Sequence, residues 1–249
     1  MLDIEERLDV AVVRLCHGKV NAMDTELLAA ITAAMREIDL ATPVVLTGTD
    51  PAFSAGADLR RIVEGGPAYV ERFLAALSET VLAVFARPGP VVAAINGHAI
   101  AGGCVLAAAC DTRMMSAGRI GLSELTVGVP FPAAALEIMR HRVGPNLGKL
   151  VLSATLFDPP QALSLGLIDQ FVWPGNLLDA AVSEAARLGG ISPEAFAFTK
   201  RALRAPVHER VAASTEDDAT VARIWCSART RETISAYLES LRRPAASPS

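Results

Sequence analysis

Two short stretches rich in small residues constrain the fold of this chain more than any other feature. Phe53-Ser-Ala-Gly-Ala-Asp-Leu59 follows the apolar run 44–47, and Ile95-Asn-Gly-His-Ala-Ile-Ala-Gly-Gly-Cys104 follows the apolar run 91–94. Each pattern predicts a strand that ends in a tight turn and passes into a helix. Because the first N–H groups of a helix have no partner within it, such a turn presents free hydrogen-bond donors. Two converging turns could bind one developing oxyanion, although singly the small residues could simply permit a tight connection.

Length and charge narrow the class of protein. The chain has 249 residues, of which 51% are hydrophobic and 20% charged, which suits one domain with a sizeable core. A net charge of −4 without any run of Lys or Arg predicts no nucleic-acid partner. The segment 1–8 lacks the features of a secretory signal, and the longest apolar run, 99–110, is shorter than the roughly 20 residues of a membrane span. We expect no membrane partner and a cytoplasmic location.

Strand–helix alternation fills the first two-thirds of the chain, and helical patterns fill the last third. Asp24 is a candidate N-cap, and Pro67 suits the first turn of a long helix toward Arg87. Residues 121–127 are predicted as a short extended piece, and 167–172 as a last strand among helices.

These patterns predict an α/β fold with three parts. We expect a core over 1–190, a helical C-terminal region over 191–242 and a disordered tail over 243–249. The apolar residues of the last helices, such as Trp225 and Ile234, are expected to pack against neighbouring repeats or subunits.

Metal and nucleophilic chemistry have no good candidate in this sequence. The four histidines are scattered, and no HExxH, GxSxG or Walker-type motif is present. The four cysteines lack metal-ligand spacing and are expected to be reduced, mostly buried thiols. We therefore expect no metal site.

The two turns, in this order and with this wording, resemble the crotonase (enoyl-CoA hydratase/isomerase) superfamily. The resemblance extends over nearly the full length, from Asn21-Ala22 to the C-terminal helices. It implies a spiral core of ββα units, assembly as a homotrimer or a dimer of trimers, and an acyl-CoA thioester substrate. It also places the thioester carbonyl between the backbone N–H groups of Ala57 and Gly102, with no cofactor beyond the CoA of the substrate. By the same resemblance, contacts with substrate are expected from Ala22, Ser54, Ala55, Asp58, Leu59, Gly103 and Val105.

The resemblance also bears on the acid/base residues. Hydratases of the family carry two catalytic glutamates, and this chain has Val105 at the first position and Glu124, in Ser123-Glu-Leu-Thr-Val-Gly128, at the second. Hydration is easiest with two carboxyl groups, whereas moving a double bond from C3–C4 to C2–C3 needs one carboxylate. Together with the segments 156–163 and 166–170, this substitution makes the chain most similar to the Δ3,Δ2-enoyl-CoA isomerases, with Glu124 as the base.

Other interpretations stay open at this stage. Most glutamates are surface residues, but the apolar neighbours of Glu124 favour partial burial, which would raise its pKa. Glu137 and His141, four residues apart on a predicted helix, are expected to form a surface pair, with Glu137 as an alternative second acid. A hydratase, and a catalytically silent acyl-CoA-binding protein, are the alternative functions.

Overall fold

The computed structural model describes residues 1–242, and the predicted disordered tail over 243–249 lies outside the described residues. A six-stranded sheet in the order β1-β2-β3-β5-β7-β10 forms its centre. Its strands are β1 (Leu2–Arg7), β2 (Val10–Leu15), β3 (Val44–Thr47), β5 (Val91–Ile95), β7 (Thr112–Met115) and β10 (Gln170–Phe171). All neighbours pair in parallel except β1 and β2, which are antiparallel.

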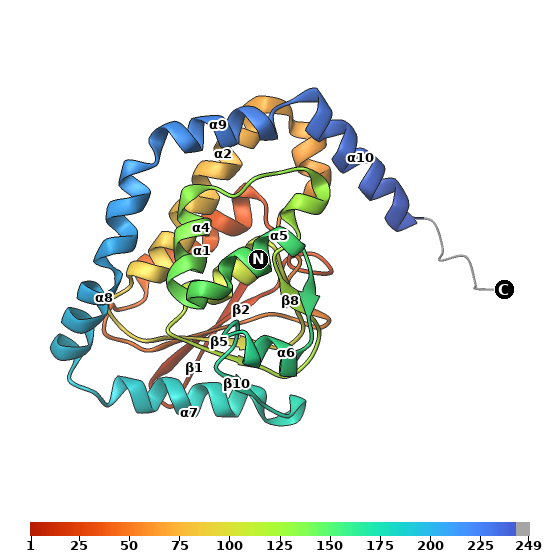
Figure 1. Cartoon of the computed structure of the whole chain (residues 1–249). Helices are drawn as coiled ribbons and strands as arrows, with labels where there is room; N and C mark the ends of the chain where they lie inside the picture. The colour runs from red at the N-terminus through yellow and green to blue at the C-terminus, as the bar shows by residue number, and fades with distance from the viewer. Residues whose placement is uncertain (243–249) are drawn as a thin grey trace.

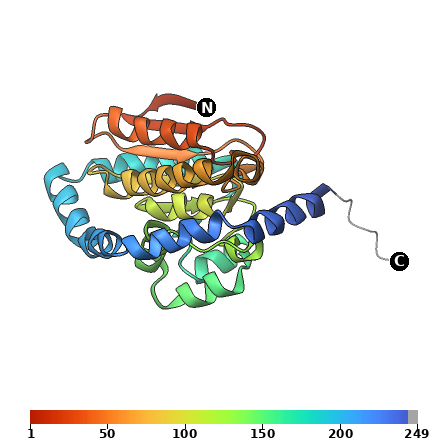
Figure 2. The same cartoon turned by 90° about the horizontal axis from the view of Figure 1, so that it is seen from above.

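The central strands β3 and β5 are buried along their whole length because helices cover both faces of the sheet. On one face, α7 (Leu177–Gly189) packs against the sheet, as seen below it in Figure 1. On the other face lie α1 (Thr25–Glu37), α2 (Leu59–Ala86), α3 (Gly102–Ala109) and α4 (Ala133–Val143). Figure 2 shows the same layers from above, with α1 and α2 side by side. This arrangement confirms the predicted α/β class.

Local signals explain where several helices begin. The predicted N-cap Asp24 accepts a hydrogen bond from the backbone N–H of Leu27 at 2.8 Å. The long helix predicted from Pro67 toward Arg87 is confirmed. The span α2 is broken at Gly66, whose φ of 67° and ψ of −173° are not helical, so a short helical segment from Leu59 precedes the long one that starts at Pro67. The remaining helical segments are α5 (Leu147–Ser153), α6 (Pro159–Ser164) and the short 3-10 turns η2 (Gly144–Asn146) and η3 (Pro174–Asn176).

A second, four-stranded sheet corrects the prediction in several places. It has the order β4-β6-β8-β9, with β4 (Ala52–Ser54), β6 (His98–Ile100), β8 (Ile120–Gly121) and β9 (Leu156–Phe157). The predicted extended piece over 121–127 is wrong beyond Gly121, since residues 124–127 form the 3-10 turn η1 (Glu124–Val127). Gly128 ends this turn with φ 75°, a left-handed conformation that favours glycine. The last strand, β10, is also shorter than the predicted 167–172.

The C-terminal region is helical, as predicted, and wraps around the core. It consists of α8 (Pro193–Ala213), α9 (Thr215–Trp225) and α10 (Ala228–Arg242), which run up one side of the molecule and across α2 in Figure 1. Asp111, just before β7, binds α8: its carboxylate accepts from Lys200 Nζ at 2.7 Å and from Arg204 Nη2 at 2.8 Å. Within residues 1–242, no helix has the length and apolar character needed to cross a membrane.

Candidate active site

The two glycine-containing turns meet at one pocket in the core. Ala57 from the first turn and Gly102 from the second both line it, together with Val105 and Glu124. A Cβ added to Gly56 would lie 3.4 Å from Gly102 N, which shows how closely the turns approach. The cavity measures about 30 Å³, and its other walls include side chains from α2, α4 and α9.

Hydrogen bonds to neighbouring residues hold the first turn in place. Ser54 Oγ donates to the carbonyl oxygen of Asn21 at 2.8 Å and accepts from Gly56 N at 3.2 Å. Met23 N donates to the Gly56 carbonyl at 2.7 Å, and Asp58 N donates to the Met23 carbonyl at 2.8 Å. These bonds fix the peptides on both sides of Ala57, whose own N–H has no hydrogen-bond partner among the described residues.

The second turn contains a strained residue directly before its free donor. Ala101 has φ 53° and ψ −122°, a conformation that is costly for a residue other than glycine. Ala101 sets the orientation of the next peptide, and Gly102 N, the first amide of α3, finds no acceptor within residues 1–242. Both turns therefore bring an unused N–H to the same pocket.

The adjacent glycines of this turn have different roles. A Cβ on Gly102 would meet Met23 Sδ at 3.2 Å, whereas a Cβ on Gly103 would lie 2.3 Å from the backbone oxygen of Ser54. Gly103 thus permits α3 to pack directly against β4, and any side chain there would force the two apart.

Glu124 supplies the acidic group of the pocket. It begins η1, and its Oε2 is buried without a hydrogen-bond partner, so the expected partial burial is confirmed. Burial raises the pKa of Glu124 to about 8, against a smaller lowering by the backbone amides of Glu124 and Ser123. Among the described residues that line the pocket, Glu124 is the only carboxylate.

The remaining predicted contact residues lie around the turns. Ala22 precedes the bridge at Met23, Ala55 N donates to the Val20 carbonyl at 3.0 Å, and Leu59 begins α2. The Asp58 carboxylate caps α2 by accepting from the backbone N–H groups of residues 60 and 61. The residues that line the pocket do not include Ala22, Ser54, Ala55, Asp58, Leu59 or Gly103, so their contact with substrate stays a prediction.

The predicted surface pair of Glu137 and His141 is wrong. Glu137 instead accepts hydrogen bonds from Arg140 and Arg210, and it is 8% exposed. His141 packs its ring edge-on against Phe85, with centroids 5.5 Å apart. Glu137 is held by two guanidinium groups and does not line the pocket that contains Glu124.

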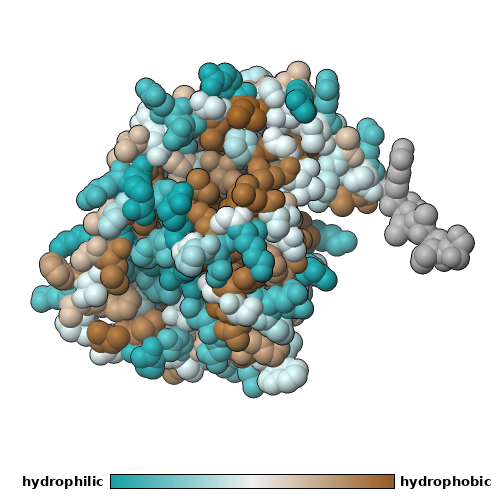
Figure 3. Space-filling view, viewed as in Figure 1, coloured by the Kyte–Doolittle hydropathy of each residue, from teal (hydrophilic) through white to brown (hydrophobic). Residues whose placement is uncertain are grey.

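The sequence reasoning missed most of the apolar wall. Phe73 and Leu77 belong to the apolar stripe of α2, which indicates core and carries no separate signal for a binding site. Trp225 was expected only as a packing residue, yet it reaches the pocket from a segment about a hundred residues beyond Glu124. Figure 3 shows hydrophobic residues gathered in the upper middle of this face, below α9.

The sequence and the structure of this chain are similar to those of known proteins. A family model described as enoyl-CoA hydratase/isomerase matches residues 5–245. A putative enoyl-CoA hydratase of Thermus thermophilus is 35% identical over 195 residues, covering 74% of this chain and 76% of that protein. The human mitochondrial enoyl-CoA delta isomerase 1 is 29% identical over 217 residues, covering 84% and 72%. The crystal structure of human mitochondrial delta3-delta2-enoyl-CoA isomerase superposes with a TM-score of 0.91 and 26% identity, covering 97% of this chain and 98% of that chain.

Proposed function

Because this chain belongs to the enoyl-CoA hydratase/isomerase family and has its crotonase fold, we propose that it is a Δ3,Δ2-enoyl-CoA isomerase. One observation carries the proposal: a single buried carboxylate, Glu124, shares an apolar pocket with the free N–H groups of Ala57 and Gly102. This set of groups suits a reaction that needs one base and one oxyanion site.

In the proposed reaction, the thioester oxygen accepts hydrogen bonds from the N–H groups of Ala57 and Gly102. The ionised Glu124 removes a proton from C2, and the electron pair moves onto the thioester oxygen to give a dienolate. The two N–H dipoles stabilise that negative charge, an interaction whose loss typically costs roughly 10²–10³ in rate. The protonated Glu124 then returns the proton to C4, and the double bond ends between C2 and C3.

Val105 supports the isomerase over the hydratase. Addition of water to a double bond is aided by two carboxyl groups that position the water and transfer its proton. Val105 occupies the position of the first hydratase glutamate by resemblance, and it lines the same pocket as Glu124. A hydratase remains the second candidate, since relatives named hydratase are among those most similar in sequence.

A panel of thioester substrates tests the proposal. Purified protein should convert 3-enoyl-CoA to 2-enoyl-CoA and should hydrate 2-enoyl-CoA slowly, if at all. Brisk hydration with no isomerisation would support the hydratase instead, and binding of both without turnover would support a silent acyl-CoA-binding protein. Because no metal or redox step enters the proposed mechanism, activity should survive a chelator unchanged.

We also propose assembly as a homotrimer or a dimer of trimers. Ile224 and Leu241 on the C-terminal helices are 39% and 65% exposed in the single chain, which leaves apolar surface for a neighbouring subunit. Light scattering at micromolar concentration should give the mass of three or six chains, and a stable monomer would contradict this proposal.

A further inference from the structure

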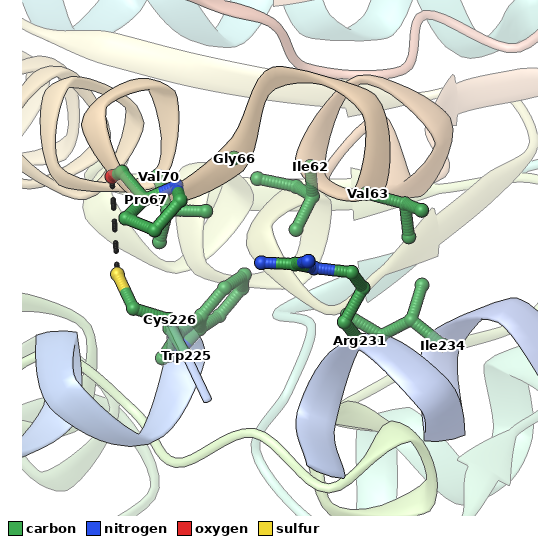
Figure 4. Close-up of a pocket in the computed structure, with 9 residues that line it drawn as sticks. All are labelled: Ile62, Val63, Gly66, Pro67, Val70, Trp225, Cys226, Arg231 and Ile234. Carbon is green, nitrogen blue, oxygen red and sulfur yellow. Dashed lines mark hydrogen bonds between the residues drawn. The ribbon is translucent and has the colours of Figure 1, made fainter. Parts of the chain in front are cut away.

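A second, smaller cavity lies next to the pocket of Glu124, and Trp225 lines both. The second cavity, of about 10 Å³, is enclosed by α2 on one side and by α9 and α10 on the other (Figure 4). Trp225 is 5% exposed, and its Nε1 donates to the Pro130 carbonyl at 2.9 Å, which fixes the indole. The indole of Trp225 therefore lies between the two cavities and separates them.

Residues of α2 line both cavities. Leu77 and Phe73 line the pocket of Glu124, whereas Val70 and Gly66 line the second cavity. Val70, Phe73 and Leu77 lie three or four residues apart in the helical part of α2 that follows Gly66, and so they share one face of that helix. Leu77 Cδ1 lies 3.7 Å from the place that a Cβ on Gly102 would occupy, so Leu77 marks the thioester end.

The path of an acyl chain follows from this arrangement. From Leu77 to Val70 is seven residues, or about 10 Å along the helix. The rings of Phe73 and Trp225 lie between those two points, with centroids 6.1 Å apart. A chain that leaves the thioester along α2 meets the indole before it can reach Val70.

Resting on the proposed function, we infer that Trp225 closes the acyl pocket and restricts the enzyme to short-chain enoyl-CoA thioesters. A water-sized group occupies roughly 10–15 Å³, so a cavity of about 30 Å³ holds roughly two or three carbon atoms. Ile62, Val70 and Ile234 line the space behind Trp225 and offer contacts to further methylene groups. Arg231 also lines this space, and its guanidinium must turn outward before a longer chain can enter (Figure 4). Removal of the indole would join the two cavities.

Binding of saturated acyl-CoA thioesters tests this inference independently of catalysis. We would titrate wild type, Trp225→Ala and Trp225→Phe with butanoyl-, hexanoyl-, octanoyl- and decanoyl-CoA by calorimetry. Wild type and Trp225→Phe, which keeps an aromatic wall, should bind butanoyl-CoA at least as tightly as the three longer thioesters. In Trp225→Ala, each methylene that enters the second cavity should tighten binding roughly fourfold.

A double variant shows whether the gain comes from the second cavity. Val70→Phe in the Trp225→Ala background fills that cavity and should remove the preference for octanoyl- and decanoyl-CoA. Circular dichroism melts would establish that each variant is folded, and Trp225→Leu replaces Trp225→Ala if the latter does not fold.

The outcomes separate this inference from the proposed function. Wild type that binds decanoyl-CoA more tightly than butanoyl-CoA would overturn the role of Trp225 and leave the proposed function standing. A Trp225→Ala protein with unchanged chain-length preference would have the same consequence. Absence of binding to every acyl-CoA would overturn the proposed function and this inference with it.

Discussion

Replacement of Glu124 by Gln should distinguish the contribution of this residue to proton transfer from its contribution to acyl-CoA binding. The amide keeps the size of the side chain but cannot take up a proton from C2. Since a positioned acid/base contributes typically 10²–10⁴-fold, turnover of 3-enoyl-CoA should fall by that factor. The N–H groups of Ala57 and Gly102 are untouched, so affinity for a saturated acyl-CoA should stay within a few-fold of wild type.

The same substitution should stabilise the protein at high pH. Burial raises the pKa of Glu124 from 4.5 to about 8, so the folded state binds a proton that the unfolded chain has lost. The contribution of this proton to the free energy of unfolding is fully present below pH 4.5, and it is lost as the pH rises to about 8. Because a pKa shift of one unit corresponds to about 1.36 kcal/mol, the free energy of unfolding of wild type falls by roughly 5 kcal/mol over this range. Water that enters around an ionised Oε2 makes this figure an upper limit.

Urea unfolding of both proteins at pH 5 and pH 9 measures this effect. The free energy of unfolding of Glu124→Gln, minus that of wild type, should be larger at pH 9 than at pH 5. Glu71→Gln, at an exposed position on α2, is the matched control and should change neither turnover nor this difference. Unchanged isomerisation by Glu124→Gln would refute the role of Glu124 as base, and a pH-independent difference in stability would refute its burial as the cause of the raised pKa.

Three further predictions follow from the site and its supports. The kcat/KM for isomerisation should rise with pH toward about 8 and then level off, because Glu124 must be ionised in the free enzyme; a flat profile from pH 6 to pH 9 would contradict this. Gly103→Ala should cost roughly 1–3 kcal/mol in thermal unfolding, because the new Cβ meets the Ser54 oxygen, whereas Gly148→Ala, with open space around it, should not destabilise. Asp111→Asn should cost roughly 3–5 kcal/mol in urea unfolding, since it leaves two buried cations of α8 without their carboxylate, and unchanged stability would argue against that ion cluster as a support.

The sequence predicted the elements whose signals are local. The predicted N-cap Asp24 caps α1, and the long helical part of α2 begins at the predicted Pro67. The two turns were also predictable, because small residues between an apolar strand and a helix restrict the backbone to few conformations. The expected burial of Glu124 followed from its apolar neighbours.

The elements that depend on distant contacts could not be predicted in this way. Strands β8 and β9 have two residues each, too few for an alternating pattern, and they form by pairing of β8 with β6 and of β9 with β8. Trp225 reaches the pocket through the path of α8 and α9 around the core, which no local pattern encodes. Glu137 was misjudged because Arg210, which binds it, lies 73 residues away in the sequence.

The late position of α9 in the chain has a consequence for synthesis. Every strand of both sheets ends by Phe171, so a ribosome has delivered the sheets, both turns and Glu124 before it reaches α8. Until α9 and α10 have been synthesised, the nascent chain lacks the residues that cover the apolar surface of α2 and close the pocket. Trp225 and Ile234 cover that surface only when the last helices dock. Translation past α9 and α10 is thus the step after which the pocket can close.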